Sequence, residues 1–582
     1  MQKQDLIDQL PPYDPRRFVP NNANLRELAQ IQKLYEHLLA RGIHSTKDLE
    51  EWLLNRSELE AAIEQTSGIL YIRMTCQTDD EQRANDYRHF IETIVPVIES
   101  FNDKLNQKYL KDIESFSLDT KRYYVHNREL KTDKELFREE NIPLQTQVSL
   151  LSQEYQTISG AMTVKFEGKE RTLPEMAKFL LEADRNLRER AWRATAERRL
   201  KDAQKLDEIF GKMLALRVKI AQNAGCENFC KYKFRSLHRF DYTPEDCKKY
   251  HTSIESLVVP LWRQILERRR QQMKLVSLRP WDTAVDPLGR APLKPFEDVK
   301  DLIEGCQKIF AKVDPELGQQ FSQMIQKGLL DLQSRKGKAP GGYQSALDES
   351  RKPFIFINAV GLDQDVRTLL HEGGHAFHTF ACAHDSLVNY RHGPMEFNEV
   401  ASMAMELLGG KYLDVFYKKG DFERSVVDHL EDIVYILGWV AVVDSFQHWI
   451  YENPNHSTEE RLKQWIFIHK RFGGDLINWN GLQKEHEYLW HRQLHIFEVP
   501  FYYIEYGIAQ LGALQVWSSA TKHGGSDSGG DWAEAVASYR RGLSFGGSRP
   551  LPEIYQASGI RFDFSENTIA PLMEMVKKEL GF

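Results

Sequence analysis

Hydrophobic side chains recur at three- and four-residue steps along much of this 582-residue chain, which is the spacing of one face of an α-helix. Leu25 to Leu39 shows the pattern clearly, and Gly42 follows it as a stop signal. The same spacing recurs in segments that begin near Ser45 and near Asp80, from Leu144 to Ile158, and from Pro174 to about Ala224. The sequence therefore predicts a mainly α fold.

One short segment breaks this pattern and predicts a β-hairpin. Met162 to Phe166 and Glu170 to Thr172 flank the turn-forming residues Glu167-Gly168-Lys169. Thr172 can then cap the helix that follows, and Glu175 can reach back to complete a capping box.

Composition and apolar runs exclude several classes of protein. The longest apolar run, Ile433 to Val443, lies between two aspartates, and its eleven residues make about 16 Å of helix, half of what a bilayer needs. We therefore expect a core helix and no membrane partner. The N-terminus lacks the apolar stretch of a signal peptide, so we expect a cytoplasmic location. A net charge of −7 argues against nucleic-acid binding. Six cysteines are too few for a disulfide scaffold in a chain of this length, so we expect buried, unpaired thiols. Composition does not predict the oligomeric state.

The segment His371-Glu372-Gly373-Gly374-His375 carries the chemistry. His371 and His375 lie one helical turn apart, so both imidazoles leave the same face and can bind one Zn²⁺ ion, with a further protein ligand and a water completing the site. Glu372 points beside that face and is placed to act as the general base toward a zinc-activated water. The two glycines each cost about 1 kcal/mol inside a helix, so we expect a substrate or a neighbouring helix to approach closely there.

The third ligand is expected from a later helix, as in thermolysin-like sites, because Ala381 stands where a metzincin would carry its third histidine. Glu399 and Glu406 are seven residues apart on one stripe of such a helix, so one can bind the metal while the other orients a ligand. Glu396, one turn before Glu399, is the rival ligand.

His371 to His378, followed 24 residues after His375 by Glu399-Val-Ala-Ser-Met, resembles the oligoendopeptidase F branch of the thimet-oligopeptidase-type zinc metallopeptidases. The resemblance extends over most of the chain, through Gly337 to Tyr343, Pro353 to Asn358, Phe501 to Tyr506, Leu551 to Glu553 and Gly559 to Phe564. It implies a mainly α, elongated body with a small β element near the zinc helix. It also implies a deep channel that admits short unstructured peptides and excludes folded proteins.

Carried over residue by residue, the resemblance makes His371, His375 and Glu399 the ligands of one zinc ion per chain and Glu372 the general base. Within this frame we expect Phe354 to Ile357 to form an edge strand that pairs with the substrate backbone, an ordinary core strand being the alternative.

A histidine and three tyrosines near residue 500 are candidates for a second catalytic role. The tetrahedral intermediate of peptide hydrolysis develops an oxyanion that needs a hydrogen-bond donor beyond the metal. His495, Tyr502 and Tyr506 are predicted donors, with Tyr502 and Tyr506 one turn apart on an expected helix. The spacing leaves open whether Tyr502 or Tyr503 faces the zinc, and the alternative for these aromatic residues is the hydrophobic core.

We therefore predict a zinc-dependent endopeptidase that hydrolyses internal bonds of oligopeptides. Residues 1–200 are expected to form an N-terminal helical region that contributes to the channel wall, and residues 201–582 the catalytic region. The alternatives are a carboxypeptidase or dipeptidyl carboxypeptidase on a similar helical fold, and a helical binding protein with a vestigial metal site.

Overall fold

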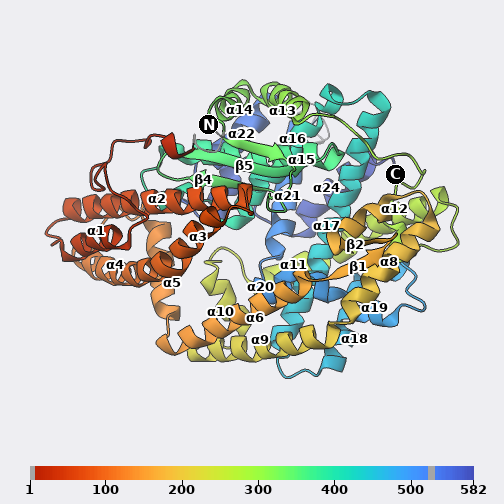
Figure 1. Cartoon of the computed structure of the whole chain (residues 1–582), viewed down its shortest axis with the longest axis horizontal. Coiled ribbons are helices and arrows are strands. Elements are labelled where there is room, and N and C mark those ends of the chain that lie inside the picture. The colour runs from red at the N-terminus through yellow and green to blue at the C-terminus, as the bar shows by residue number, and fades with distance from the viewer. Residues whose placement is uncertain (1–6, 522–530) are drawn as a thin grey trace. The chain divides into compact units, whose positions relative to one another are not determined.

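The structure, a computed structural model, describes residues 7–521 and 531–582 (Figure 1). It is built mainly of α-helices with two small sheets, which confirms the predicted fold class. The chain divides into two compact units, each assembled from three separate segments. The first unit comprises residues 7–134, 293–425 and 512–562 without the undescribed stretch, and the second comprises 135–292, 426–511 and 563–582. The predicted boundary at residue 200 stays a prediction.

Helices account for most of both units. Those of the first unit are α1 (Leu28–Ala40), α2 (Thr46–Cys76), α3 (Glu81–His89), α4 (Val95–Ser115), α13 (Val299–Val313), α14 (Pro315–Gln326), α15 (Asp363–Ala381), α16 (Met395–Gly410), α22 (Trp532–Leu543) and α23 (Leu551–Ala557). Those of the second are α6 (Ile142–Gly160), α7 (Leu173–Met176), α8 (Arg185–Leu200), α9 (Ala203–Asn223), α10 (Phe229–Ser236), α11 (Pro244–Ser253), α12 (Val259–Gln272), α18 (Thr458–Arg471), α19 (Gln483–Glu487), α20 (Leu494–Glu498) and α24 (Glu566–Glu579). Three helices run across a unit boundary along the chain: α5 (Tyr124–Leu136), α17 (Lys419–Glu452) and α21 (Ile504–Ala520).

The predicted hairpin is present in the second unit. Strands β1 (Thr163–Phe166) and β2 (Lys169–Thr172) pair antiparallel, and the turn consists of Glu167 and Gly168 alone. Both turn residues have positive φ, 47° and 75°, as a two-residue hairpin turn of the right twist requires. Thr172 accepts a hydrogen bond from the Glu175 backbone N–H, and Glu175 completes the predicted capping box.

The sheet of the first unit differs from the sequence prediction. Its strands are β3 (Leu330–Gln333), β4 (Tyr343–Leu347) and β5 (Lys352–Ala359), in the order β3-β5-β4. Phe354 to Ile357 lies in β5, so the expectation of an edge strand there is wrong: this strand is central and these four residues are buried. The physical reason is the continuous run of β-branched and aromatic side chains, which suits a strand covered on both faces. The two edge strands are β3, which pairs with β5 parallel, and β4, which pairs with it antiparallel.

The apolar run from Ile433 to Val443 is part of α17 and is mostly buried, as a core helix should be. In the described part of the chain, no helix combines the length and the apolar character that a membrane crossing would need. All six cysteines carry free thiols, and five of them are buried, whereas Cys226 is partly exposed.

Close packing of α15 against its neighbours explains the two glycines inside that helix. A Cβ atom on Gly374 would lie 2.4 Å from the carbonyl oxygen of Ala401 and 2.6 Å from the Cα of Ser402, both on α16. A Cβ atom on Gly373 would lie 2.5 Å from the ring of Phe310 on α13. The neighbouring helices therefore supply the close approach that the sequence pattern predicted.

Gly374→Ala should destabilise the protein by about 1–3 kcal/mol, because the new methyl group meets backbone atoms of α16 that cannot rotate away. Gly211→Ala is the matched control: Gly211 is exposed in α9, nothing lies within 4 Å of its added Cβ, and alanine should stabilise the helix by up to about 1 kcal/mol. Urea denaturation of both variants in the presence of a chelator measures the two effects. Equal stability of the two variants would contradict the packing argument.

Candidate metal centre

Two helices of the first unit carry the predicted metal-binding residues (Figure 1). His371, Glu372 and His375 lie on α15, and Glu399 and Glu406 lie on α16. The one-turn spacing brings the rings of His371 and His375 within 5.0 Å of each other, measured between centroids. The glycine-mediated contact between the helices then brings Glu399 opposite both rings.

Three donor atoms converge on one point. Oε2 of Glu399 is 3.5 Å from Nε2 of His371 and 3.7 Å from Nε2 of His375, and all three atoms lie within 4.8 Å of one another. A tetrahedral Zn²⁺ with bonds of about 2.1 Å separates its ligand atoms by about 3.4 Å. The donor set and its spacing therefore fit a zinc ion with a position left open.

The protonation states also suit a cation. Burial lowers the pKa of His375 to about 4, so its imidazole is neutral and its nitrogen can bind a metal. Burial would also lower the pKa of His371, but its interactions with Glu399 and Glu406 outweigh that effect and raise it. Two carboxylates, the buried Glu399 and the half-buried Glu406, thus attract positive charge to this side chain.

Further contacts orient the donors. Nδ1 of His371 donates a hydrogen bond of 2.7 Å to Oε1 of Glu406, which leaves Nε2 to face Glu399. The hydroxyl of Ser402 donates to Oε2 of Glu399 at 3.0 Å. Ser402 was missed by sequence reasoning, although its position three residues after Glu399 on the same helix is a signal that could have suggested it.

Glu372 is buried beside the donor set. Burial, together with the negative charges of Glu399 and Glu406, raises the pKa of this carboxyl to about 7, while His371 opposes the shift. The carboxylate also accepts a hydrogen bond from the backbone N–H of Gln344 in strand β4. That contact involves only the backbone of Gln344, and no sequence pattern signals it.

Two nearby residues lie outside the donor set. Glu396, the rival ligand, is buried on α16 but is not among the three residues whose donor atoms converge. His378 packs its ring edge-on against Phe397, with centroids 5.8 Å apart, and burial lowers its pKa to about 3.

The predicted donor residues near position 500 form an aromatic cluster in the second unit. The ring of His495 lies 6.0 Å from Tyr502, 4.7 Å from Tyr503 and 5.9 Å from Tyr506, between centroids. The expected helix is only partly present: α21 begins at Ile504, so Tyr502 and Tyr503 precede it. The physical reason is Phe501, whose φ of 65° is incompatible with a right-handed helix.

The three tyrosines differ in their surroundings. Tyr503 is buried and its hydroxyl interacts with the indole of Trp439, whereas Tyr502 and Tyr506 are partly exposed. The candidate metal-binding residues thus come together within the first unit. The cluster of His495 and the three tyrosines forms within the second.

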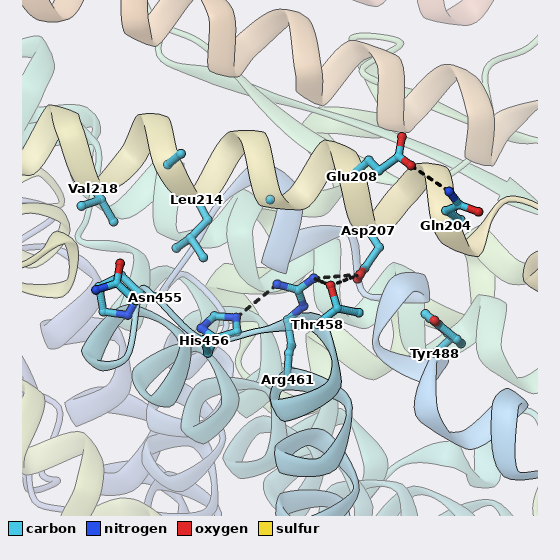
Figure 2. A pocket seen from close by; sticks show the side chains of 13 residues that line it. Gln204, Asp207, Glu208, Leu214, Val218, Asn455, His456, Thr458, Arg461 and Tyr488 are labelled. Carbon is cyan, nitrogen blue, oxygen red and sulfur yellow. Dashed lines mark hydrogen bonds and ion pairs between the residues drawn. The ribbon is translucent and has the colours of Figure 1, made fainter.

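A cavity of about 830 Å³ in the second unit has a different character (Figure 2). It lies beside α9 and the start of α18, and Arg461 at its wall is paired with Asp207 at 2.9 Å and with His456 at 3.1 Å. A cavity of this size is the usual first candidate for a ligand site. Its lining includes none of the predicted metal or catalytic residues, which lie on other segments of the chain.

Two models of known protein families match the chain. Residues 179–574 match the model of peptidase family M3, and residues 22–133 match the peptidase M3 N-terminal domain. An oligoendopeptidase F homolog of Borreliella burgdorferi is 23% identical over 331 residues, which cover 53% of this chain and 51% of that protein. The chain thus spans about half the length of this curated relative.

Solved structures match over nearly the whole chain. The structure of PZ peptidase A with an inhibitor has a TM-score of 0.85 and 27% identity, covering 97% of this chain and 99% of the other. That of oligoendopeptidase F from Enterococcus faecium has a TM-score of 0.63 and 14% identity, covering 96% of each chain, and supports the fold alone. With the M3 model matching more than half of its residues, the chain belongs to peptidase family M3.

Proposed function

We propose that this protein is a zinc-dependent endopeptidase that hydrolyses internal peptide bonds of short, unstructured oligopeptides. The observation that carries the proposal is the convergence of His371, His375 and Glu399, with a buried Glu372 beside them, in a member of peptidase family M3. The oligoendopeptidase F name of the Borreliella burgdorferi relative supports oligopeptide substrates.

In this proposal His371, His375 and Glu399 hold one zinc ion per chain, and Glu406 orients His371. When bound, the metal supplies Lewis acidity that polarises the substrate carbonyl and acidifies water. Glu372 takes a proton from the attacking water and passes it to the leaving amine. A carboxyl group whose pKa is raised to about 7 can do both near neutral pH.

Strand β4 is the proposed docking strand for the peptide backbone. It is an edge strand of the three-stranded sheet, and the N–H of its Gln344 binds Glu372. An extended peptide that adds to such an edge is held through its backbone, so its side chains need not be closely specified. Docking along β4 would therefore suit an enzyme that accepts many oligopeptides.

His495, Tyr502 and Tyr506 are proposed to donate hydrogen bonds to the oxyanion of the tetrahedral intermediate. Their clustering and the partial exposure of both tyrosines support this role, and the burial of Tyr503 against Trp439 favours Tyr502 over Tyr503.

Glu399→Ala should abolish zinc binding at micromolar metal, because only two histidine ligands remain. Glu406→Ala should weaken zinc affinity by only about 10- to 100-fold, because it removes a partner of His371 and no ligand. Elemental analysis after dialysis against buffered zinc measures both. If the two variants exchanged these phenotypes, Glu406 would be the ligand.

Glu372→Gln should retain zinc, because Glu372 is not a ligand, while kcat should fall at least about 10³-fold because the proton acceptor is gone. Zinc content and steady-state kinetics of the same preparation test this. Loss of zinc from the variant would show that Glu372 binds the metal.

Cleavage of a mixed peptide pool, followed by mass spectrometry, tests the proposed function directly. We expect internal cleavage that is equally fast for peptides with free and with amidated C-termini, that stops with a chelator, and that returns when zinc is added. Cleavage confined to free C-termini would instead identify a carboxypeptidase or dipeptidyl carboxypeptidase.

A further inference from the structure

A chain of two hydrogen bonds ends on the imidazole of His495. The indole N–H of Trp439, on α17, donates to Oε1 of Gln493 at 3.0 Å. Nε2 of the same glutamine side chain lies 2.7 Å from Nδ1 of His495. Gln493 directly precedes helix α20, which carries His495.

The indole N–H of Trp439 determines the direction of both hydrogen bonds in this series. An indole N–H can only donate, so the amide oxygen of Gln493 must face it; a flipped amide would set two donors against each other. The NH₂ group of Gln493 therefore faces His495 and donates to Nδ1. A neutral imidazole that accepts at Nδ1 carries its proton on Nε2.

Packing holds the indole in place. Trp439 is only 7% exposed, its ring meets Trp465 edge-on at 5.8 Å, and the guanidinium of Arg492 lies 4.9 Å from its centroid. The indole also interacts with the hydroxyl of Tyr503. Because Trp439 is fixed on these sides, the orientation of the Gln493 amide is fixed as well.

We propose that Gln493 is a positioning residue that locks His495 as a neutral hydrogen-bond donor through Nε2. The inference rests on the proposed function, in which His495 donates to the oxyanion. Burial lowers the pKa of His495 to about 4, which keeps the ring neutral and makes the choice of tautomer decisive. The titratable side chains whose rings surround it are Tyr502, Tyr503 and Tyr506, and the nearby cation Arg492 stacks on Trp439.

Gln493→Glu tests the proposal with little change in shape. A carboxylate can accept from Trp439 through one oxygen and from Nδ1–H of His495 through the other, so the proton should move to Nδ1 and leave a lone pair on Nε2. We expect kcat to fall by about 10²- to 10³-fold, as on removal of an oxyanion donor, with zinc content unchanged. Gln493→Met, which imposes neither tautomer, should lose less activity than Gln493→Glu.

The pH profile separates a tautomer effect from structural damage. The introduced carboxylate favours the charged imidazolium and raises the pKa of His495, and the imidazolium carries protons on both nitrogens. As pH falls through that raised pKa, the kcat of Gln493→Glu relative to the wild type should therefore rise. If Gln493→Glu lowers kcat at neutral pH, a ratio that then stays constant or falls toward acid pH would overturn the proposal.

Neutron diffraction from deuterated crystals reads the tautomer without any assay. We expect deuterium on Nε2 of His495 in the wild type and on Nδ1 in Gln493→Glu, and a wild-type deuteron on Nδ1 would overturn the positioning role. In a His495→Gln background, Gln493→Glu should cause no further loss of kcat. If the tautomer moves while peptide cleavage is unaffected, the donor role of His495 in the proposed function fails and the positioning role stands.

Discussion

The contact between Gly374 and the backbone of Ala401 sets the geometry on which the candidate metal centre depends. Any side chain at residue 374 would hold α16 away from α15, and Glu399, two residues before Ala401, would move away from both histidines. The Ala401 carbonyl is held from its other side by the hydroxyl of Tyr539 at 2.7 Å. The cost of glycine inside a helix, about 1 kcal/mol per residue, is thus offset by a helix approach that brings a carboxylate to two imidazoles.

That approach also concentrates negative charge in a buried place. The charges of Glu399 and Glu406 raise the pKa of His371 against the effect of burial. They also add to the burial that raises the pKa of Glu372. A divalent cation satisfies the same demand for positive charge, so protons and metal compete for this donor set. The fold contributes a buried anionic site, and the histidine spacing gives it coordination geometry.

Local patterns were enough to predict the parts of this structure that neighbouring residues decide. The hairpin turn at Glu167 and Gly168 and the pairing of His371 with His375 follow from spacing along the chain. The central position of β5 does not, because it requires β3 to pair with the edge of β5 that faces away from β4, and local sequence does not specify that pairing. The interruption before α21 escaped prediction because the left-handed conformation of Phe501 is enforced by tertiary packing, including a hydrogen bond from its N–H to the buried Gln447.

Two histidines of this protein show why a residue type alone does not define a chemical role. At His371 the Nδ1 partner is the acceptor Glu406, so in the neutral ring the proton resides on Nδ1 and Nε2 offers a lone pair suited to a metal. At His495 the Nδ1 partner is the amide NH₂ of Gln493, so the proton resides on Nε2, which becomes a donor suited to an oxyanion. In the neutral ring, Nε2 is therefore an acceptor in His371 and a donor in His495. The residue that decides this lies 35 positions from the histidine in the case of Glu406 and two in the case of Gln493. The sequence predicts both histidines as functional residues, but only the structure shows which nitrogen of each ring can donate and which can accept.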